Sequence, residues 1–180
     1  MKIVHDIIGV NWIWLFLLLP IFSGCEKEST TNTDIKPRPV ISYKTTLPIE
    51  TITIADQPFI IELASNNQTR QKGLMSRKSL EKNRGMLFLF RKEGDLSFHM
   101  NNCLIDIDIA FIKATGEITT IHEMKKPLPG KPSLLYDTKA KSKYALELAA
   151  GTFARLGVKE GDIITIPKTI KQISPEASIR

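Results

Sequence analysis

The chain has 180 residues, of which 25 are Lys or Arg, 19 are Asp or Glu and 42% are apolar, and its formal net charge is +6. This composition is typical of one globular domain with additional segments, and it excludes a chain that is disordered throughout. Ten Gly and ten Pro without a regular period exclude a collagen-like sequence, and two Cys are too few for a disulfide framework.

The N-terminal segment is typical of a secretory leader. Residues 7–21 are apolar apart from Asn11, and this run is too short for a transmembrane helix but suits a signal peptide. Phe22-Ser-Gly-Cys25 then resembles a bacterial lipobox, in which the chain is cut before the cysteine and the thiol is acylated. We expect residues 1–24 to be a signal peptide and Cys25 to be lipidated. The alternatives are a plain signal peptide and an uncleaved interfacial anchor.

Lipidation of Cys25 would make the mature protein a membrane-anchored lipoprotein of the cell envelope that faces the periplasm or the exterior. Residues 25–50 are rich in Thr, Ser, Lys, Glu, Asn and Pro and lack apolar periodicity, which predicts a flexible linker. Residues 51–166 are expected to form the domain, and residues 167–180 a weakly structured C-terminal tail. Cys103 would have no disulfide partner, and its apolar neighbours favour a buried, inert thiol.

Within the domain, short apolar runs separated by turn residues predict seven or eight strands. One or two short helices are expected, one opened by a capping box of Ser65 and Gln68, and a helical turn over residues 152–156. The predicted fold class is mainly β (α+β): a small, mainly antiparallel β-barrel or sandwich with one or two short peripheral helices. The predicted strands cover residues 51–55, 59–64, 85–90, 96–100, 105–112, 117–122, 144–149 and 162–166.

Six segments of the domain carry a shared pattern, in one order. They are Gly73-Leu-Met-Ser-Arg77, Arg84-Gly-Met-Leu-Phe-Leu-Phe90, Ser97-Phe-His-Met-Asn-Asn102, Ile107-Asp-Ile-Ala-Phe111, Leu146-Glu-Leu-Ala-Ala-Gly151 and Arg155-Leu-Gly157 with Gly161-Asp162. Together they resemble the bacterial domain of unknown function 192 family. The resemblance covers residues 51–166 and implies a small, mainly-β domain without an established reaction. Where that family usually has Trp, Lys and Thr, this chain has His99, Asn101 and Cys103.

Two carboxylates on one predicted strand are candidate functional groups. Strand alternation places Asp106 and Asp108 on the same face. Such a pair could divide acid and base roles or bind a hard cation. A half-solvated strand whose carboxylates meet basic side chains explains the pattern equally simply, and we favour that interpretation. Asp108 is the better functional candidate because it matches the family segment.

Glu147 is a second candidate, on another predicted strand. It alternates against Leu146 and Leu148, so it lies on the opposite face with two alanines that leave room for a long cation. We expect a structural or ligand-binding ion pair between Glu147 and an arginine, either Arg77 or Arg84.

The excess of basic residues is concentrated in two segments. Residues 70–92 hold eight Lys or Arg and one acidic residue, and residues 125–143 hold six and one. Such clusters can bind anionic lipid or polymer. Nucleic acid is not expected, because the predicted location is extracytoplasmic and only 7% of residues are aromatic. No motif for a metal or cofactor is present, so we expect neither.

These observations favour a membrane-tethered extracytoplasmic binding or accessory domain in contact with an anionic envelope polymer, lipid or protein partner. The expected ligand-binding residues are Arg77, Arg84, His99, Asn101, Asn102, Asp108 and Glu147. One alternative is a small acid/base enzyme that uses Asp108 with His99 or Glu147 in a shared pocket. Another is a structural or assembly module, which would have no pocket and would expose a large apolar patch.

Overall fold

The structure is a computed structural model that describes residues 47–176. The predicted signal peptide, the predicted lipidation site Cys25 and nearly all of the predicted linker lie outside the described residues. Among the described residues, no helix has the length and apolar content needed to cross a membrane.

The described part of the chain consists mainly of strands, which confirms the predicted fold class. In chain order its elements are β1 (Ile49–Ile54), β2 (Gln57–Ala64), α1 (Asn67–Lys72), β3 (Arg84–Gly94), β4 (Ser97–His99), β5 (Ile107–Ile112), β6 (Ile118–Met124), β7 (Leu135–Asp137), β8 (Ser142–Ala149), α2 (Thr152–Leu156) and α3 (Lys168–Lys171).

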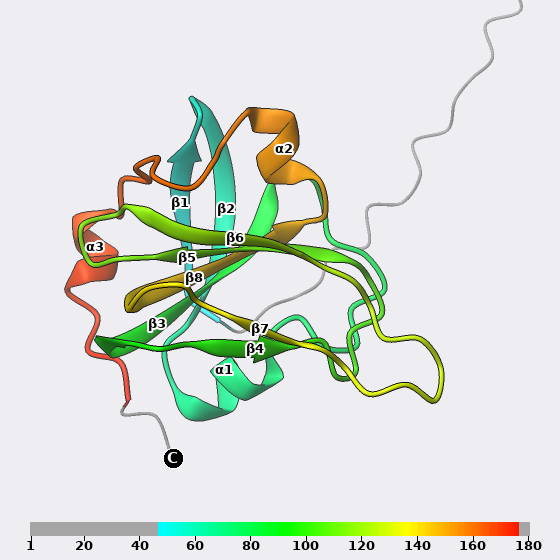
Figure 1. The fold of residues 1–180 in the computed structure, drawn as a ribbon. Coiled ribbons are helices and arrows are strands. Elements are labelled where there is room, and N and C mark those ends of the chain that lie inside the picture. The colour runs from blue at the N-terminus through cyan, green and yellow to red at the C-terminus, as the bar shows by residue number, and fades with distance from the viewer. Residues whose placement is uncertain (1–46, 177–180) are drawn as a thin grey trace, which may run out of the picture. The chain divides into compact units, whose positions relative to one another are not determined.

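Six of the strands form one open, mixed sheet (Figure 1). Its order is β1-β2-β3-β8-β5-β6, and neighbouring strands are antiparallel except for β2 and β3, which are parallel. The edge strands β1 and β6 do not pair with each other, so the sheet is not closed into a barrel. The two remaining strands, β4 and β7, form a small antiparallel sheet of their own. The sandwich-like alternative therefore describes the fold.

Each face of the large sheet is covered by its own layer and its own core cluster. On one face the sheet packs against α2 and α3, through Phe153 and Ile170. On the other face it packs against the small sheet and the segment after α1, through Leu74, Phe98 and Tyr136. Because successive side chains of a strand point to opposite faces, every central strand supplies both clusters. Each strand residue is thereby assigned to one side of the molecule.

Several local predictions differ from the structure. The capping box of α1 is formed by Asn66 and Thr69. Each lies one residue after its predicted counterpart, Ser65 and Gln68 respectively. The strand expected over residues 162–166 is reduced to one isolated bridge, between Ile163 and Glu117. Helix α3 lies within the segment expected to be a tail, and there are three short helices in the described residues where one or two were expected.

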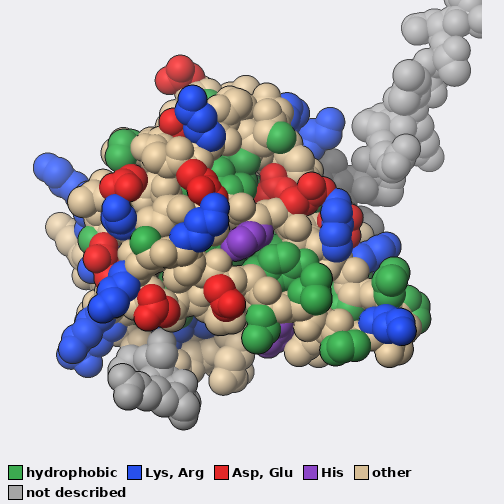
Figure 2. Space-filling model, viewed as in Figure 1, with side chains coloured by type: hydrophobic (Ala, Val, Ile, Leu, Met, Phe, Trp, Pro, Cys, Tyr) green, Lys and Arg blue, Asp and Glu red, His purple; other side chains and the backbone are tan. Residues whose placement is uncertain are grey.

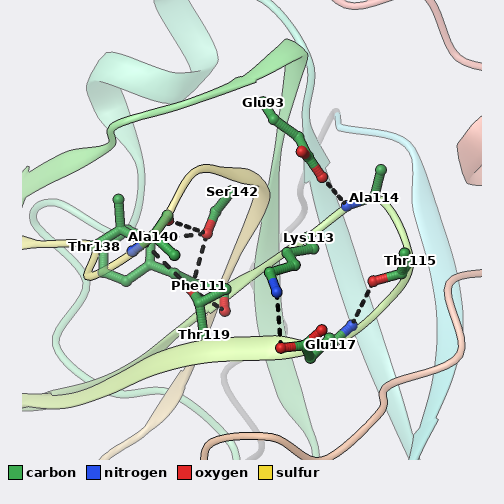
Figure 3. Close-up of polar contacts among 10 residues, drawn as sticks. All are labelled: Glu93, Phe111, Lys113, Ala114, Thr115, Glu117, Thr119, Thr138, Ala140 and Ser142. Atoms are coloured by element: carbon green, nitrogen blue, oxygen red, sulfur yellow. Dashed lines mark hydrogen bonds and ion pairs between the residues drawn. The ribbon is translucent and has the colours of Figure 1, made fainter.

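A cluster of hydroxyl groups stabilises the turn end of the β5–β6 hairpin (Figure 3). The β5–β6 register shifts next to Phe111, which leaves the strand ladder irregular there. The hydroxyl of Thr119 lies 3.2 Å from the carbonyl of Phe111 and 2.9 Å from the hydroxyl of Ser142, at the start of β8. An ion pair between Lys113 and Glu117, 2.8 Å long, spans the turn itself. These contacts join β5, β6 and β8 at the end of the sheet opposite α2.

Candidate functional site

A pocket of about 300 Å³ lies on the face of the sheet that the small sheet covers. Strands β3 and β8 form its floor. Its walls are formed by α1, by the segment that follows α1, and by β4. We call it the Glu147 pocket. Its lining residues are Asn67, Arg70, Gln71, Lys72, Gly73, Leu74, Met75, Phe88, Phe90, Ser97, Phe98, His99, Cys103 and Glu147.

Helix α1 is short, and Arg70 holds it against the rest of the pocket wall. The guanidinium donates hydrogen bonds of 3.0 Å to the carbonyls of Ser65 and Leu89 and to that of Glu176. It also lies 5.3 Å from the centre of the Phe90 ring, within the range of a cation–π contact. These bonds fix α1 to β3 and to the C-terminal segment, so the wall is built before any ligand arrives.

Two buried glutamates lie on the pocket side of the sheet. Glu62 on β2 and Glu147 on β8 are both paired in register with Met86 on β3, so all three side chains share one face. With neighbouring strands about 4.8 Å apart, the two glutamate backbones are about 10 Å apart. Both glutamates stand in the same local pattern, because Glu62-Leu-Ala64 and Glu147-Leu-Ala149 follow apolar residues.

Arg77 pairs with Glu62, and the expected Arg77–Glu147 or Arg84–Glu147 ion pair is not the one that forms. The guanidinium donates two hydrogen bonds to the Glu62 carboxylate, of 2.6 and 2.8 Å. Both side chains are largely buried, so this bidentate pair neutralises a charge on the sheet face. Arg84 pairs instead with Glu81, at 3.1 Å, where both side chains are partly exposed.

The carboxyl of Glu147 is left with an unmet hydrogen-bonding need. The residue is only 5% exposed, and its Oε2 atom is buried without a hydrogen-bond partner in the described residues. Burial raises the pKa of Glu147 from 4.5 to about 8, although the nearby Arg77 acts in the opposite direction. At neutral pH this carboxyl is therefore mostly protonated, and in that form it can both donate and accept a hydrogen bond.

Cys103, which also lines the pocket, is held in its thiol form. Burial, and to a smaller degree the negative charge that Glu147 carries at high pH, together raise the pKa of Cys103 to about 11. Since the thiolate is the nucleophilic species, this residue is a poor nucleophile at neutral pH. Cys103 is half-buried where a buried thiol was expected, and its raised pKa fits the expected inertness.

The predicted residues His99, Asn101 and Asn102 lie at one turn beside the pocket. His99 lines the pocket, and its Nδ1 atom accepts a hydrogen bond of 3.3 Å from the backbone N–H of Asn101. The carbonyl of Asn102 accepts a 2.8 Å bond from the N–H of Ser76, one residue before Arg77. This bond joins the turn to the segment after α1. The two asparagines therefore lie between two lining residues, His99 and Cys103, and are not themselves part of the described lining.

Asp108 lies on the opposite face of the sheet, away from this pocket. It is paired in register with Leu148, one residue from Glu147, so the two carboxyl groups point to opposite faces. Its carboxylate accepts hydrogen bonds from the N–H groups of Gly151 and Phe153, at 3.0 and 3.1 Å, at the start of α2. Asp108 thus meets the unpaired N–H groups of a helix whose own cap supplies no side-chain bond.

This geometry bears on the enzyme alternative. The structure does not bring Asp108 together with His99 or Glu147, because Asp108 lines a different hollow, with Phe153 and Glu160. Within residues 47–176, no group of three or more His, Cys, Asp or Glu side chains is arranged to hold a metal ion. The arrangement around Glu147 is suited to holding a ligand by hydrogen bonds in an apolar setting.

The role of Asp108 leads to a stability prediction. Asp108→Asn replaces one acceptor oxygen by an NH₂ group facing a backbone N–H, so we expect a loss of about 1–3 kcal/mol in the free energy of unfolding. Urea denaturation at neutral pH measures this loss. Asp106→Asn is the matched control, because Asp106 is more exposed and accepts from Lys126 at the surface. Equal losses in the two variants would argue against the capping role.

The sequence predictions missed several lining residues. Three phenylalanines, Phe88, Phe90 and Phe98, supply aromatic rings to the pocket, and Arg70 fixes its wall by hydrogen bonds. The sequence did carry a signal at Glu62, which binds Arg77 outside the lining. There a single carboxylate interrupts the apolar residues of a strand, as Glu147 does, and this pattern indicates a buried charge that needs a partner. The phenylalanines carried no such signal, because aromatic side chains in apolar strands usually belong to the core.

Comparison with known proteins agrees with the resemblance seen in the sequence. The model of the DUF192 family, described as an uncharacterised ACR, matches residues 50–166. A crystal structure from Sinorhizobium meliloti 1021, of a protein described as a candidate transcription regulator, is similar with 32% identity and a TM-score of 0.60. The similarity covers 68% of this chain and 97% of that one.

A second crystal structure is of a protein of unknown function from Novosphingobium aromaticivorans DSM 12444. It has 28% identity and a TM-score of 0.59, and the match covers 72% of this chain and 90% of that one. No match was found among the curated proteins.

Proposed function

The chain belongs to the DUF192 family, and we propose that this member is a membrane-tethered extracytoplasmic domain that binds a small molecule in the Glu147 pocket. The observation that carries the proposal is the Oε2 atom of Glu147, which is buried without a hydrogen-bond partner in residues 47–176, in a side chain that lines a pocket. A buried polar atom without a partner costs about 1–3 kcal/mol. A ligand that hydrogen-bonds to Glu147 recovers that cost, whereas an empty or purely apolar site does not.

The charges around the pocket favour a neutral or anionic ligand. Arg70 and Lys72 line it, and the positive charge of Arg77 acts to lower the pKa of Glu147. Among the described residues, Glu147 is the single acidic side chain in the lining, and its raised pKa keeps it mostly uncharged at neutral pH. A cationic ligand would meet like charges and would require Glu147 to lose its proton. An acid or an amide can instead accept a hydrogen bond from the protonated carboxyl.

The remaining walls favour a ligand with a compact apolar body. Phe88 and Phe98 meet edge to face, with ring centres 4.9 Å apart, and Phe90 stands beside Phe98 at 6.4 Å. Such rings bind flat or aliphatic groups through their faces and edges. A volume of about 300 Å³ is at the small end of ligand pockets. We therefore propose a small molecule with one polar head and one apolar body.

The tether is supported by the leader sequence and the lipobox-like Cys25. Anchoring at Cys25 would keep the pocket at the membrane surface, within reach of molecules of the cell envelope. Mass spectrometry of the mature N-terminus tests this part: an acylated Cys25 is expected, and an intact leader on a cytosolic chain would contradict it.

Three probes of similar shape and different charge test the pocket. Benzoate, benzamide and benzylamine share one ring and differ in carrying an anionic, neutral or cationic head. We expect benzoate and benzamide to perturb the amide NMR signals of α1, β3 and β8, with benzylamine the weakest. The reason is the protonated carboxyl of Glu147 together with the lysine and arginine in the lining.

Glu147→Leu and Glu123→Leu form the matched pair of variants for this experiment. Glu147→Leu is expected to raise the dissociation constant of benzoate by about tenfold, the equivalent of one lost hydrogen bond. Glu123 lies on β6 with its side chain more than half exposed and outside this pocket, so its variant should bind as the parent does. Tightest binding of benzylamine, or equal binding by both variants, would contradict the proposal.

A further inference from the structure

An exposed loop on one side of the domain carries the most exposed large apolar side chains of the described residues. We call residues 125–135 the leucine loop. They connect β6 to β7 and include Leu135, the first residue of β7. Leu128, Leu134 and Leu135 are 69%, 70% and 67% exposed. The loop projects from the sheet in Figure 1, and Figure 2 shows hydrophobic side chains gathered on the same side of the molecule, next to Lys and Arg side chains.

The leucine loop is held in place by hydrogen bonds to the segment between β4 and β5. The N–H of Met100 donates to the hydroxyl of Ser133, at 2.6 Å, and the N–H of Lys126 donates to Asp106, at 2.9 Å. Leu104, which lies between Met100 and Asp106 in the sequence, is itself half exposed. The apolar side chains are thus presented by an anchored surface of the domain.

Lysines accompany the leucines on this loop. Lys126 and Lys131 form no ion pair within residues 47–176, whereas Lys125 bridges to Glu123 and Asp106. Exposed apolar side chains beside cations without ion pairs suit one leaflet of an anionic bilayer. The leucines would enter the boundary of the acyl chains, and the lysines would meet the anionic headgroups. A protein partner would need a shaped complement to four separate leucines, and a second copy would bring its own lysines against these.

We propose that the leucine loop contacts an anionic lipid surface and so orients the tethered domain on the membrane. The inference rests on the proposed tether, which keeps the loop within reach of lipid, and it is independent of what the Glu147 pocket binds. The occupant is the lipid surface itself, with Leu128, Leu134 and Leu135 as the inserted residues and Lys126 and Lys131 as the headgroup contacts.

The test uses the full chain with a single indole as a reporter. The full chain is expressed and purified from membranes after processing, and both natural tryptophans, Trp12 and Trp14, which lie in the predicted leader, are changed to Phe so that any uncleaved chain adds no indole signal. Leu128→Trp then places one indole on the loop, and Ile163→Trp is the matched control at another side chain that is 63% exposed. Each variant is combined with vesicles of phosphatidylcholine, with or without phosphatidylglycerol, and flotation measures how much chain is on the vesicles.

With phosphatidylglycerol present, we expect the indole of the Leu128→Trp variant to emit at shorter wavelength and to be quenched by brominated lipid. The Ile163→Trp indole should emit as in water. Adding Lys126→Glu and Lys131→Glu to the Leu128→Trp variant should reverse the shift, while flotation continues through the tether.

A floating chain whose Leu128→Trp indole emits as in water would overturn the lipid contact alone. A chain that does not float would contradict the tether and the contact together. A shift that grows with protein concentration in the absence of vesicles would assign the loop to self-association, which also overturns the inference. Benzoate binding is measured separately, so none of these outcomes is confused with failure of the pocket.

Discussion

Arg77→Met is expected to lower the free energy of unfolding by about 3–5 kcal/mol at neutral pH. The substitution removes both hydrogen bonds of the Arg77–Glu62 pair and leaves the Glu62 carboxylate, 3% exposed, on a buried sheet face without its bidentate partner. Removing one member of a buried ion pair costs far more than the pair contributes over two neutral side chains. Urea denaturation of the parent and the variant measures the difference.

Arg84→Met is the matched control for this prediction. Its guanidinium pairs with Glu81 at the surface, with side chains 31% and 40% exposed, so the expected loss is at most about 1 kcal/mol. Adding Glu62→Gln to Arg77→Met should recover part of the stability, because no buried charge is then left. Losses of similar size in the two arginine variants, or no recovery in the double variant, would show that the pair does not neutralise a buried charge.

Glu147→Gln is expected to change how stability depends on pH. In the folded chain the pKa of Glu147 is raised from 4.5 to about 8, so between these values the folded state holds a proton that the unfolded state has released. The stability of the parent therefore falls as the pH rises through this window. The shift corresponds to roughly 5 kcal/mol in full, at about 1.4 kcal/mol per pKa unit. Glutamine has no proton to lose, so the variant lacks this component.

The measurement is the free energy of unfolding of parent and variant at about pH 5 and about pH 9. From about pH 5 to about pH 9, the free energy of unfolding of the variant should rise by several kcal/mol relative to that of the parent. The other titrating groups are common to both chains, so their contributions cancel in this comparison. Glu160→Gln serves as the control, because hydrogen bonding to Lys139 lowers the pKa of Glu160 and keeps it ionised across the range. A difference between the parent and Glu147→Gln that does not change with pH would mean that Glu147 is solvated.

Local patterns predicted much of the fold, and long-range pairing was beyond them. Alternation placed Glu147 opposite Leu146 and Leu148, and the structure confirms this because those leucines belong to the other core cluster. The short strand β7 was not predicted, since its three residues form a strand only by pairing with β4. The apolar residues after Asp162 were predicted as a strand, but only Ile163 finds a bridging partner.

The candidate site was predicted in part, and its errors have one cause. Which arginine meets which glutamate depends on the strand order β2-β3-β8, which places Arg77 over Glu62 with Glu147 two strands away. Asp108 was expected near the ligand, but its partners lie at the N-terminal end of α2, 43 and 45 residues along the chain. No spacing rule predicts such contacts, because they depend on how separate elements pack. Sequence pattern predicted the basic character of residues 125–143 but not that Leu128 would be exposed among them.

A pH titration of the Glu147 side-chain carboxyl by carbon NMR, with and without benzoate, tests the ligand-binding account most directly. The account predicts a pKa of about 8 in the free chain, and a still higher value with benzoate present, because the protonated carboxyl donates to the bound anion. A pKa near 4.5 that benzoate leaves unchanged would contradict it, because Glu147 would then be an ordinary solvated carboxylate that touches no ligand.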